Sequence, residues 1–315
     1  ARLRLAQIRQ NAGRLPEAFA TARRGLALAA DNNLPLFTRI GSSKNQEGTL
    51  AASLIRLLTE LRHDPDSARL PPGVDFVRVP TRNADNPLLT VYYRTPPPSM
   101  NSPAPAPPPR VLVLSPVHNL DPLETLSTPG PWTDFADAHG LVLVSPRFHI
   151  SYGVDRLDHA FTHPRFASAW SGEALLQALD EISRRTPTDA SRVFVCGHAS
   201  GSGFASHFTA WRPDRVAALA LAKGNWGLAQ QPLPGHAPLS AQTRVPVWIG
   251  ANPWDNHDVP ENQPRHAYVL DYAARLRDAG AQVIVENFPA PTSAPTEDMQ
   301  NAARAFLARQ LSRSP

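Results

Sequence analysis

Residues 197–201, GHASG, have the spacing of a catalytic turn but lack the residue that would carry out the chemistry. They follow an apolar run, VFVC at 193–196, and precede an apolar-polar pattern that predicts a helix. Between a strand and a helix, the pattern Gly-x-Ser-x-Gly forms a nucleophile elbow, in which a sharp turn exposes the central serine. Ala199 occupies that central position. The sequence therefore retains the elbow and lacks its nucleophile.

The residues around Ala199 support the elbow more strongly than they support a displaced nucleophile. Gly197 and Gly201 lie where a Cβ atom would make the strand and the helix clash. Ser200 and Ser202 are the serines nearest in sequence to position 199, where the nucleophile is expected. Ser200 lacks flanking glycines at the required distance, and its side chain would project from the first helical turn. A shifted nucleophile is therefore disfavoured.

The elements that would position this turn occupy residues 71–315. Two runs, 74–80 and 88–94, predict an antiparallel pair, and six more β-branched runs alternate with helical patterns. Those six runs are 110–116, 141–146, 192–197, 216–222, 245–251 and 281–288, and the main expected helices are 169–183, 203–211, 266–279 and 297–311. Buried strands alternating with helices predict a mostly parallel eight-stranded sheet with helices on both faces, in the α/β class.

Residues 1–70 have a different pattern and are expected to form a separate all-α segment. Residues 3–32 predict a helical hairpin that weakly resembles a tetratricopeptide repeat, and LAASLIRLLTEL at 50–61 predicts a third helix. These helices are a candidate surface for a protein partner. The chain begins at Ala1 inside a helical pattern, as expected of processing or truncation. Prolines over 95–110 predict an extended loop.

Three segments carry a resemblance to a known family. They are VLVLSPVHN at 111–119, the elbow and following strand at 192–221, and FPAPTSAPTEDMQNAARAFL at 288–307. Over residues 74–312 the chain resembles the α/β-hydrolase superfamily, in particular secreted esterases and proteins similar to polyhydroxybutyrate depolymerase. The resemblance implies a bacterial, secreted or periplasmic protein and, if the protein is active, carboxylic ester hydrolysis.

The same resemblance implies a catalytic triad in the chain order nucleophile, acid, histidine. Pro253 stands where the acid is expected, so that Asp255 and Asp258 are displaced candidates. Ser293 stands at the expected histidine position, and no histidine follows His266. Without an imidazole, even a serine at the elbow would be poorly activated. The triad is therefore expected to be degenerate, with no catalytic set intact.

The resemblance also implies an oxyanion hole and a ligand crevice at the carboxyl ends of the strands. The oxyanion donors would be the backbone N–H groups of Ser200 and Asn119, the latter replacing a glycine. The loops leaving those strand ends mix aromatic and polar residues, which suits a small-molecule ester or a peptide. The candidate pocket residues are His118, Arg147, His149, Tyr152, His198, Trp226, Trp254 and His257.

Composition excludes several other classes of function. The formal net charge is only +4, without a block of like charge, so nucleic-acid binding is not expected. No apolar run is long enough for a membrane span. The single cysteine, Cys196, excludes an internal disulfide and is expected in the core. DNHD at 255–258 lacks a ligand-spaced partner, so neither a metal nor another cofactor is expected.

Three hypotheses of function follow from these residues. The first is a catalytically impaired α/β-hydrolase-like protein, a pseudoenzyme, with a role in binding or assembly. The second is a serine esterase whose nucleophilic serine has been replaced by Ala199. The third is different chemistry in the same pocket, with His118, His149 or His257 as acid or base.

Overall fold

A computed structural model of the chain describes nine stretches of it, namely residues 70–81, 88–97, 107–115, 122–127, 129–148, 171–223, 237–253, 265–290 and 295–313. The expected helical segment at 1–70 lies outside these stretches except for its last residue, as does much of the proline-rich loop. The domain boundary near residue 70 therefore stays a prediction.

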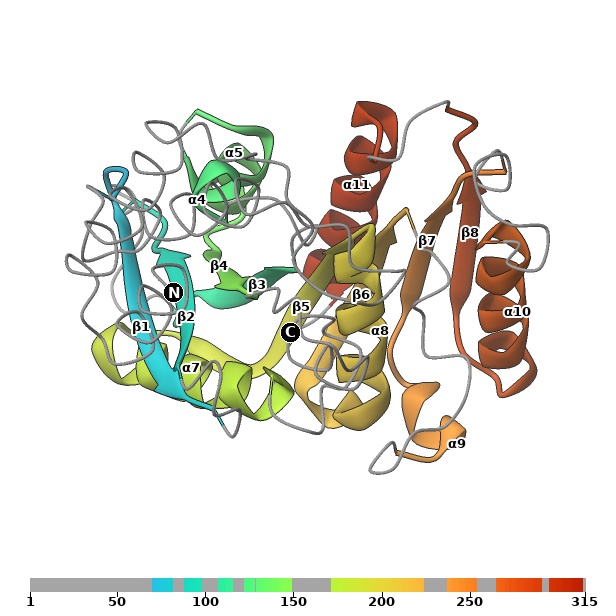
Figure 1. Cartoon of the computed structure of the whole chain (residues 1–315), viewed down its shortest axis with the longest axis horizontal. Helices are drawn as coiled ribbons and strands as arrows, with labels where there is room; N and C mark the ends of the chain where they lie inside the picture. The colour runs from blue at the N-terminus through green and yellow to red at the C-terminus, as the bar shows by residue number, and fades with distance from the viewer. Residues whose placement is uncertain are drawn as a thin grey trace, which may run out of the picture. The chain divides into compact units, whose positions relative to one another are not determined.

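The described residues form one eight-stranded sheet in the order β1-β2-β4-β3-β5-β6-β7-β8 (Figure 1). β1 pairs antiparallel with β2, and β2 pairs antiparallel with β4, whereas the remaining neighbours are parallel. The strands are β1 (Val74–Pro80), β2 (Leu88–Arg94), β3 (Arg110–Ser115), β4 (Val142–Arg147), β5 (Asp189–His198), β6 (Val216–Ala222), β7 (Val247–Ala251) and β8 (Val283–Asn287). The expected α/β architecture, with the elbow after the third parallel strand in chain order, is confirmed.

The four longest described helices match the expected ones, and the short helices were not predicted. They are α4 (Pro122–Leu126), α5 (Pro131–Ala138), α7 (Ser171–Arg185), α8 (Ser200–Trp211), the 3-10 turn η1 (Pro213–Arg215), α9 (Leu239–Gln242), α10 (Arg265–Asp278) and α11 (Glu297–Arg313). α8 begins three residues before the expected start at Gly203, because the helix starts directly from the elbow. The apolar periodicity did not predict α4, α5 and α9, which are short.

Two glycines show which helices cover which face of the sheet. A Cβ atom on Gly197 would lie 2.6 Å from Ser202 Cα, so β5 and α8 touch through their backbones. A Cβ atom on Gly250 would lie 2.6 Å from Met299 Cγ, on α11. Because the strand register places these glycines on opposite faces, α8 and α11 lie on opposite sides of the sheet. The core around α8 also includes α7 and α10.

α5 belongs to the α11 side and is fastened at both ends. Near its C-terminus, Arg94 of β2 donates two parallel hydrogen bonds to the Asp137 carboxylate, at 2.6 and 2.8 Å. Near its N-terminus, the Trp132 indole N–H donates to Gln300 Oε1 on α11 at 3.1 Å. The forked pairing of guanidinium and carboxylate fixes direction as well as distance. α5 is therefore held in register with both the sheet and α11.

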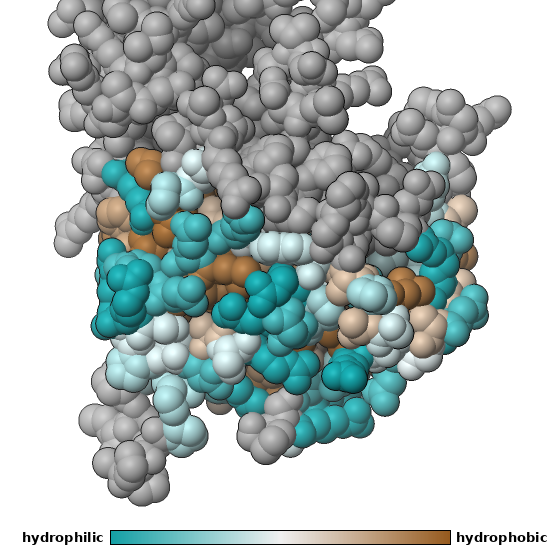
Figure 2. Space-filling view, turned by 90° about the horizontal axis from the view of Figure 1, so that it is seen from below, coloured by the Kyte–Doolittle hydropathy of each residue, from teal (hydrophilic) through white to brown (hydrophobic). Residues whose placement is uncertain are grey.

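The surface seen from below is mostly hydrophilic over the described residues, with apolar side chains visible in limited areas (Figure 2). Among the residues that the structure describes, three large apolar side chains are exposed, Leu88, Leu270 and Ile284. Among the described helices, none has the length and apolar character needed to cross a bilayer.

The contact between β5 and α8 generates a stability prediction. We expect Gly197→Ala to lower the free energy of unfolding by about 3 kcal/mol, because backbone atoms of α8 must move to admit the methyl group. Gly140→Ala is the matched control: Gly140 has a φ of +61° but nothing within 4 Å of its Cβ position, so only backbone strain of about 1 kcal/mol applies. Urea unfolding followed by circular dichroism measures both. Equal losses in the two variants would contradict a steric origin.

Candidate functional site

The elbow at the end of β5 has the strained geometry that the sequence predicts. Ala199 has φ 47° and ψ −110°, and α8 begins at the next residue. The Ala199 N–H donates to Ala222 O of β6 at 3.0 Å, and the Ser202 N–H donates to Ala199 O at 2.9 Å. A non-glycine residue pays about 1–3 kcal/mol for such backbone angles unless its surroundings enforce them. The tip of a sharp turn is thus held by hydrogen bonds to both neighbouring elements.

A second strained residue lies beside the first. Lys223 follows β6, has a φ of 64° and is buried, with 3% of its surface exposed. Among the described residues, Ala199 and Lys223 are the two non-glycine residues with positive φ. The Ser202 hydroxyl links the end of β5 to Lys223, because it lies 2.9 Å from Gly197 O and 3.4 Å from Lys223 O. Backbone strain is therefore concentrated where β5 and β6 end, as is typical of functional sites.

The strand ends bring further polar residues to the same edge of the sheet. Arg147 ends β4 and is buried, and Ser115 ends β3 with a buried hydroxyl that has no hydrogen-bond partner among the described residues. Asn252 follows β7, and its amide donates to Ala290 O at 2.8 Å while its Oδ1 accepts from the Ala290 N–H at 3.3 Å. This pair links the chain leaving β7 to the chain leaving β8. Those are the two loops in which the acid and histidine of a triad are expected.

Most of the candidate residues named from the sequence lie outside the described residues. They are His118, Asn119, His149, Tyr152, Trp226, Trp254, Asp255, His257, Asp258 and Ser293. Their roles as pocket, oxyanion, acid and histidine positions stay predictions. Pro253, which precedes the acid candidates, lies directly after Asn252 at the edge of the sheet.

His198 lies next to the elbow, but its side chain packs on the other face of the sheet. Its ring lies 5.3 Å from the Trp132 ring of α5, and its Nε2 lies 3.6 Å from Cys196 Sγ. The residue is buried, with 7% of its surface exposed. Burial, and to a smaller extent the nearby Arg304 cation, lowers the pKa of His198 from 6.5 to about 4. The imidazole is therefore neutral at pH 7 and packed beneath the turn.

Cys196, which precedes the tip of the elbow by three residues, is a structural core residue. Cys196 is fully buried, and burial raises the pKa of its thiol, which keeps it protonated and unreactive. The expected core position of this cysteine is confirmed. Within the described part of the chain, no group of three or more His, Cys, Asp or Glu side chains could hold a metal ion.

Comparisons with known proteins agree with the fold. No family model matches the chain, and no curated protein matches it. Among solved structures, one of two fungal esterases from Rhizomucor miehei aligns at a TM-score of 0.53 with 13% identity, over 90% of this chain and 94% of that one. The substrate-bound fluorophosphonate-binding serine hydrolase F of Staphylococcus aureus aligns at 0.52 with 14% identity, over 76% and 99%.

A third structure is a putative dipeptidyl aminopeptidase IV from Bacteroides ovatus, at a TM-score of 0.51 and 12% identity, over 79% of this chain and 37% of that one. Together with the sheet order and the elbow, these likenesses define the class: the chain has an α/β-hydrolase fold, similar to that of esterases and serine hydrolases. At these identities the likeness concerns the fold alone.

The tip of the elbow carries no nucleophilic side chain. The side chain at the tip of the turn is a methyl group, which cannot attack a carbonyl carbon. What remains is a helix N-terminus at the carboxyl edge of the sheet, where backbone N–H groups favour an anion or a carbonyl oxygen. The described residues therefore place a helix N-terminus beside the elbow but supply no nucleophile at position 199.

The environment of His198 generates a pH-dependence prediction. In the unfolded chain His198 takes up a proton near its ordinary pKa of 6.5, whereas in the folded protein it does so only near 4. The stability that depends on neutral His198 is therefore complete above pH 6.5 and is lost as the pH falls toward 4, by about 3 kcal/mol at most.

We expect His198→Phe to remove this part of the acid destabilisation, as measured by urea unfolding at pH 7 and pH 4.5. The control is His139→Gln, which replaces an exposed histidine outside this buried cluster and is measured in the same way. If the free energy of unfolding fell by the same amount between pH 7 and pH 4.5 in His198→Phe and in the wild type, His198 would not be the source of the acid destabilisation.

Proposed function

We propose that the protein is a catalytically impaired α/β-hydrolase-like protein that acts by binding or assembly. The single observation that supports this most directly is the elbow itself: the strained turn is intact, and its tip is Ala199. A scaffold that keeps the turn keeps the helix N-terminus beside it. The ligand that we expect at this edge of the sheet is a small ester or a peptide.

The expected loss of the other triad members supports the same proposal. Ser293 stands where the resemblance implies a histidine, and Pro253 where it implies an acid. His198 offers no replacement, because its ring packs against Trp132 on the face of the sheet away from α8. Triad members act as a unit, so a scaffold missing its base gains little from a nucleophile alone.

A second candidate function is a serine esterase whose nucleophile has been replaced by Ala199. The backbone angles at this position favour it, since a serine there would occupy a geometry suited to an exposed nucleophile. The two candidates make opposite predictions for the Ala199→Ser variant. They can therefore be separated by one substitution.

We expect the wild-type protein to hydrolyse p-nitrophenyl butyrate no faster than a denatured sample, and Ala199→Ser to gain less than about tenfold over that level. A fluorophosphonate probe, which labels activated serines, should leave both proteins unlabelled. The matched control is Ala305→Ser, which adds a hydroxyl on the exposed surface of α11.

A gain of about a thousandfold or more in Ala199→Ser, with covalent labelling absent from Ala305→Ser, would reject the impaired-enzyme proposal and establish the esterase. The measurement depends on correct folding of the variant. Its circular dichroism spectrum should therefore match that of the wild type.

A further inference from the structure

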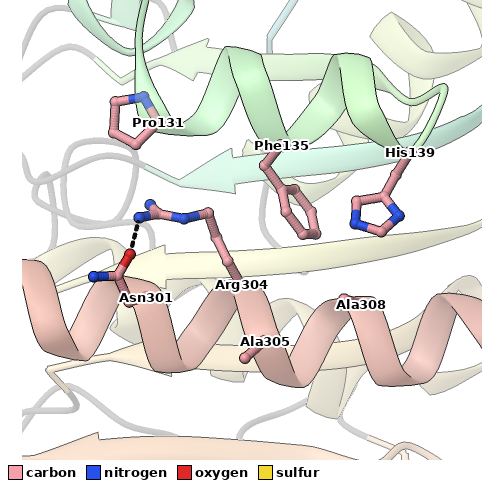
Figure 3. A pocket seen from close by; sticks show the side chains of 7 residues that line it. All are labelled: Pro131, Phe135, His139, Asn301, Arg304, Ala305 and Ala308. Carbon is pink, nitrogen blue, oxygen red and sulfur yellow. Dashed lines mark hydrogen bonds between the residues drawn. The ribbon is translucent and has the colours of Figure 1, made fainter.

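A groove lies between α5 and α11, on the face of the sheet opposite α8. Its volume is about 400 Å³, which is within the range of small-molecule sites. Figure 3 shows side chains of α5 pointing toward α11 and the Arg304 side chain rising from α11 toward α5. The lining residues are Pro131, Phe135, His139, Asn301, Arg304, Ala305 and Ala308. None of these residues belongs to the elbow or to the loops at the carboxyl edge of the sheet.

Arg304 brings an unusual cation into this groove. Its Cζ atom lies 5.2 Å from the Trp132 ring centroid, and its Nη2 donates to Asn301 Oδ1 at 2.5 Å. Its Nη1 is buried and has no hydrogen-bond partner. Within the described part of the chain, no carboxylate forms an ion pair with it. The guanidinium is thus held by an aromatic face and a neutral amide.

The energetics of this arrangement favour an added anion. Desolvation lowers the pKa of Arg304, and the two acidic groups that act against this, Cys196 and then Glu297, do so without forming an ion pair. A buried donor without a partner costs about 1–3 kcal/mol, and more when it is charged. Arg94 avoids this cost, because it pairs with the Asp137 carboxylate. The missing element at Arg304 is an acceptor with negative charge.

The remainder of the groove is shaped for a flat apolar group. The rings of Phe135 and His139 lie together on α5, with centroids 4.6 Å apart. Opposite them α11 presents the small side chains of Ala305 and Ala308 (Figure 3). Aromatic rings on one side and methyl groups on the other accept a planar ring, and the forked guanidinium of Arg304 matches a carboxylate.

We propose that the groove between α5 and α11 is a binding site for a small aryl carboxylate, with the carboxylate on Arg304 and the ring between Phe135 and Ala308. The site is independent of the elbow, so it holds for an impaired or an active hydrolase alike. His139 and Asn301 form the polar rim at its two ends. A neutral molecule of the same shape lacks the charge that Arg304 requires.

The probe for this site is 2-naphthoate, titrated into the intact protein and followed by the indole N–H resonance of Trp132, assigned through Trp132→Phe. The ring of Trp132 lies under Arg304, so this resonance reports on the site. We expect saturable shifts with a dissociation constant of about 1 mM or lower. The neutral 2-naphthamide should bind with a dissociation constant at least tenfold higher, because it lacks the charged hydrogen bond between carboxylate and guanidinium.

Arg304→Gln should weaken naphthoate binding about tenfold to a hundredfold, and Arg309→Gln, an exposed change on the same helix, should leave it unaltered. Ala308→Leu keeps the charge and fills the groove, so it should weaken binding by at least tenfold even where Arg304→Gln does not fold. Wild-type affinity in Arg304→Gln or Ala308→Leu, equal binding of the amide, or no binding of naphthoate would overturn the proposal.

Discussion

The close approach of β5 and α8 at Gly197 is the constraint on which the rest of the site depends. The strand and the helix approach so closely that no Cβ atom fits at Gly197, and the chain makes this approach by turning at Ala199, which has positive φ, directly into α8. The same approach lets Ser202 hydrogen-bond to Gly197 O and brings the end of β6 alongside. The strained turn is therefore a consequence of packing, and it persists whether or not its tip carries a nucleophile.

The alternation of side chains along β5 divides the molecule into two environments. Gly197 faces α8, so Cys196 and His198 must face α5 and α11. On that side the structure combines a neutral buried imidazole, an inert thiol and an aromatic ring that carries Arg304. His198 thus packs against the end of β5 on the face of the sheet away from α8. A general base would instead have to lie beside the tip of the turn.

Much of the fold was predictable from the sequence, because buried parallel strands require continuous β-branched runs such as 216–222. The elbow was predictable for a steric reason, the spacing of its glycines. α5 was missed, although Pro131 after Gly130 is a helix-start signal. The contact of Trp132 with His198 and Arg304 could not be predicted, since it joins three elements that are distant in the sequence. The orientation of His198 could have been predicted, because side chains alternate between the two faces along β5.

The groove and the elbow share a continuous set of contacts, from Arg304 through Trp132 to His198 and the turn. Contact transmits an effect only where a ligand binds two arrangements of the intervening residues with different affinity. At the end of β5, the hydrogen bond from Ala199 to Ala222 and the close packing of α8 against Gly197 both oppose a second arrangement. A ligand in the groove is therefore not expected to shift the end of β5. We expect it to stabilise the α5–α11 side of the fold while leaving the geometry of the elbow unchanged.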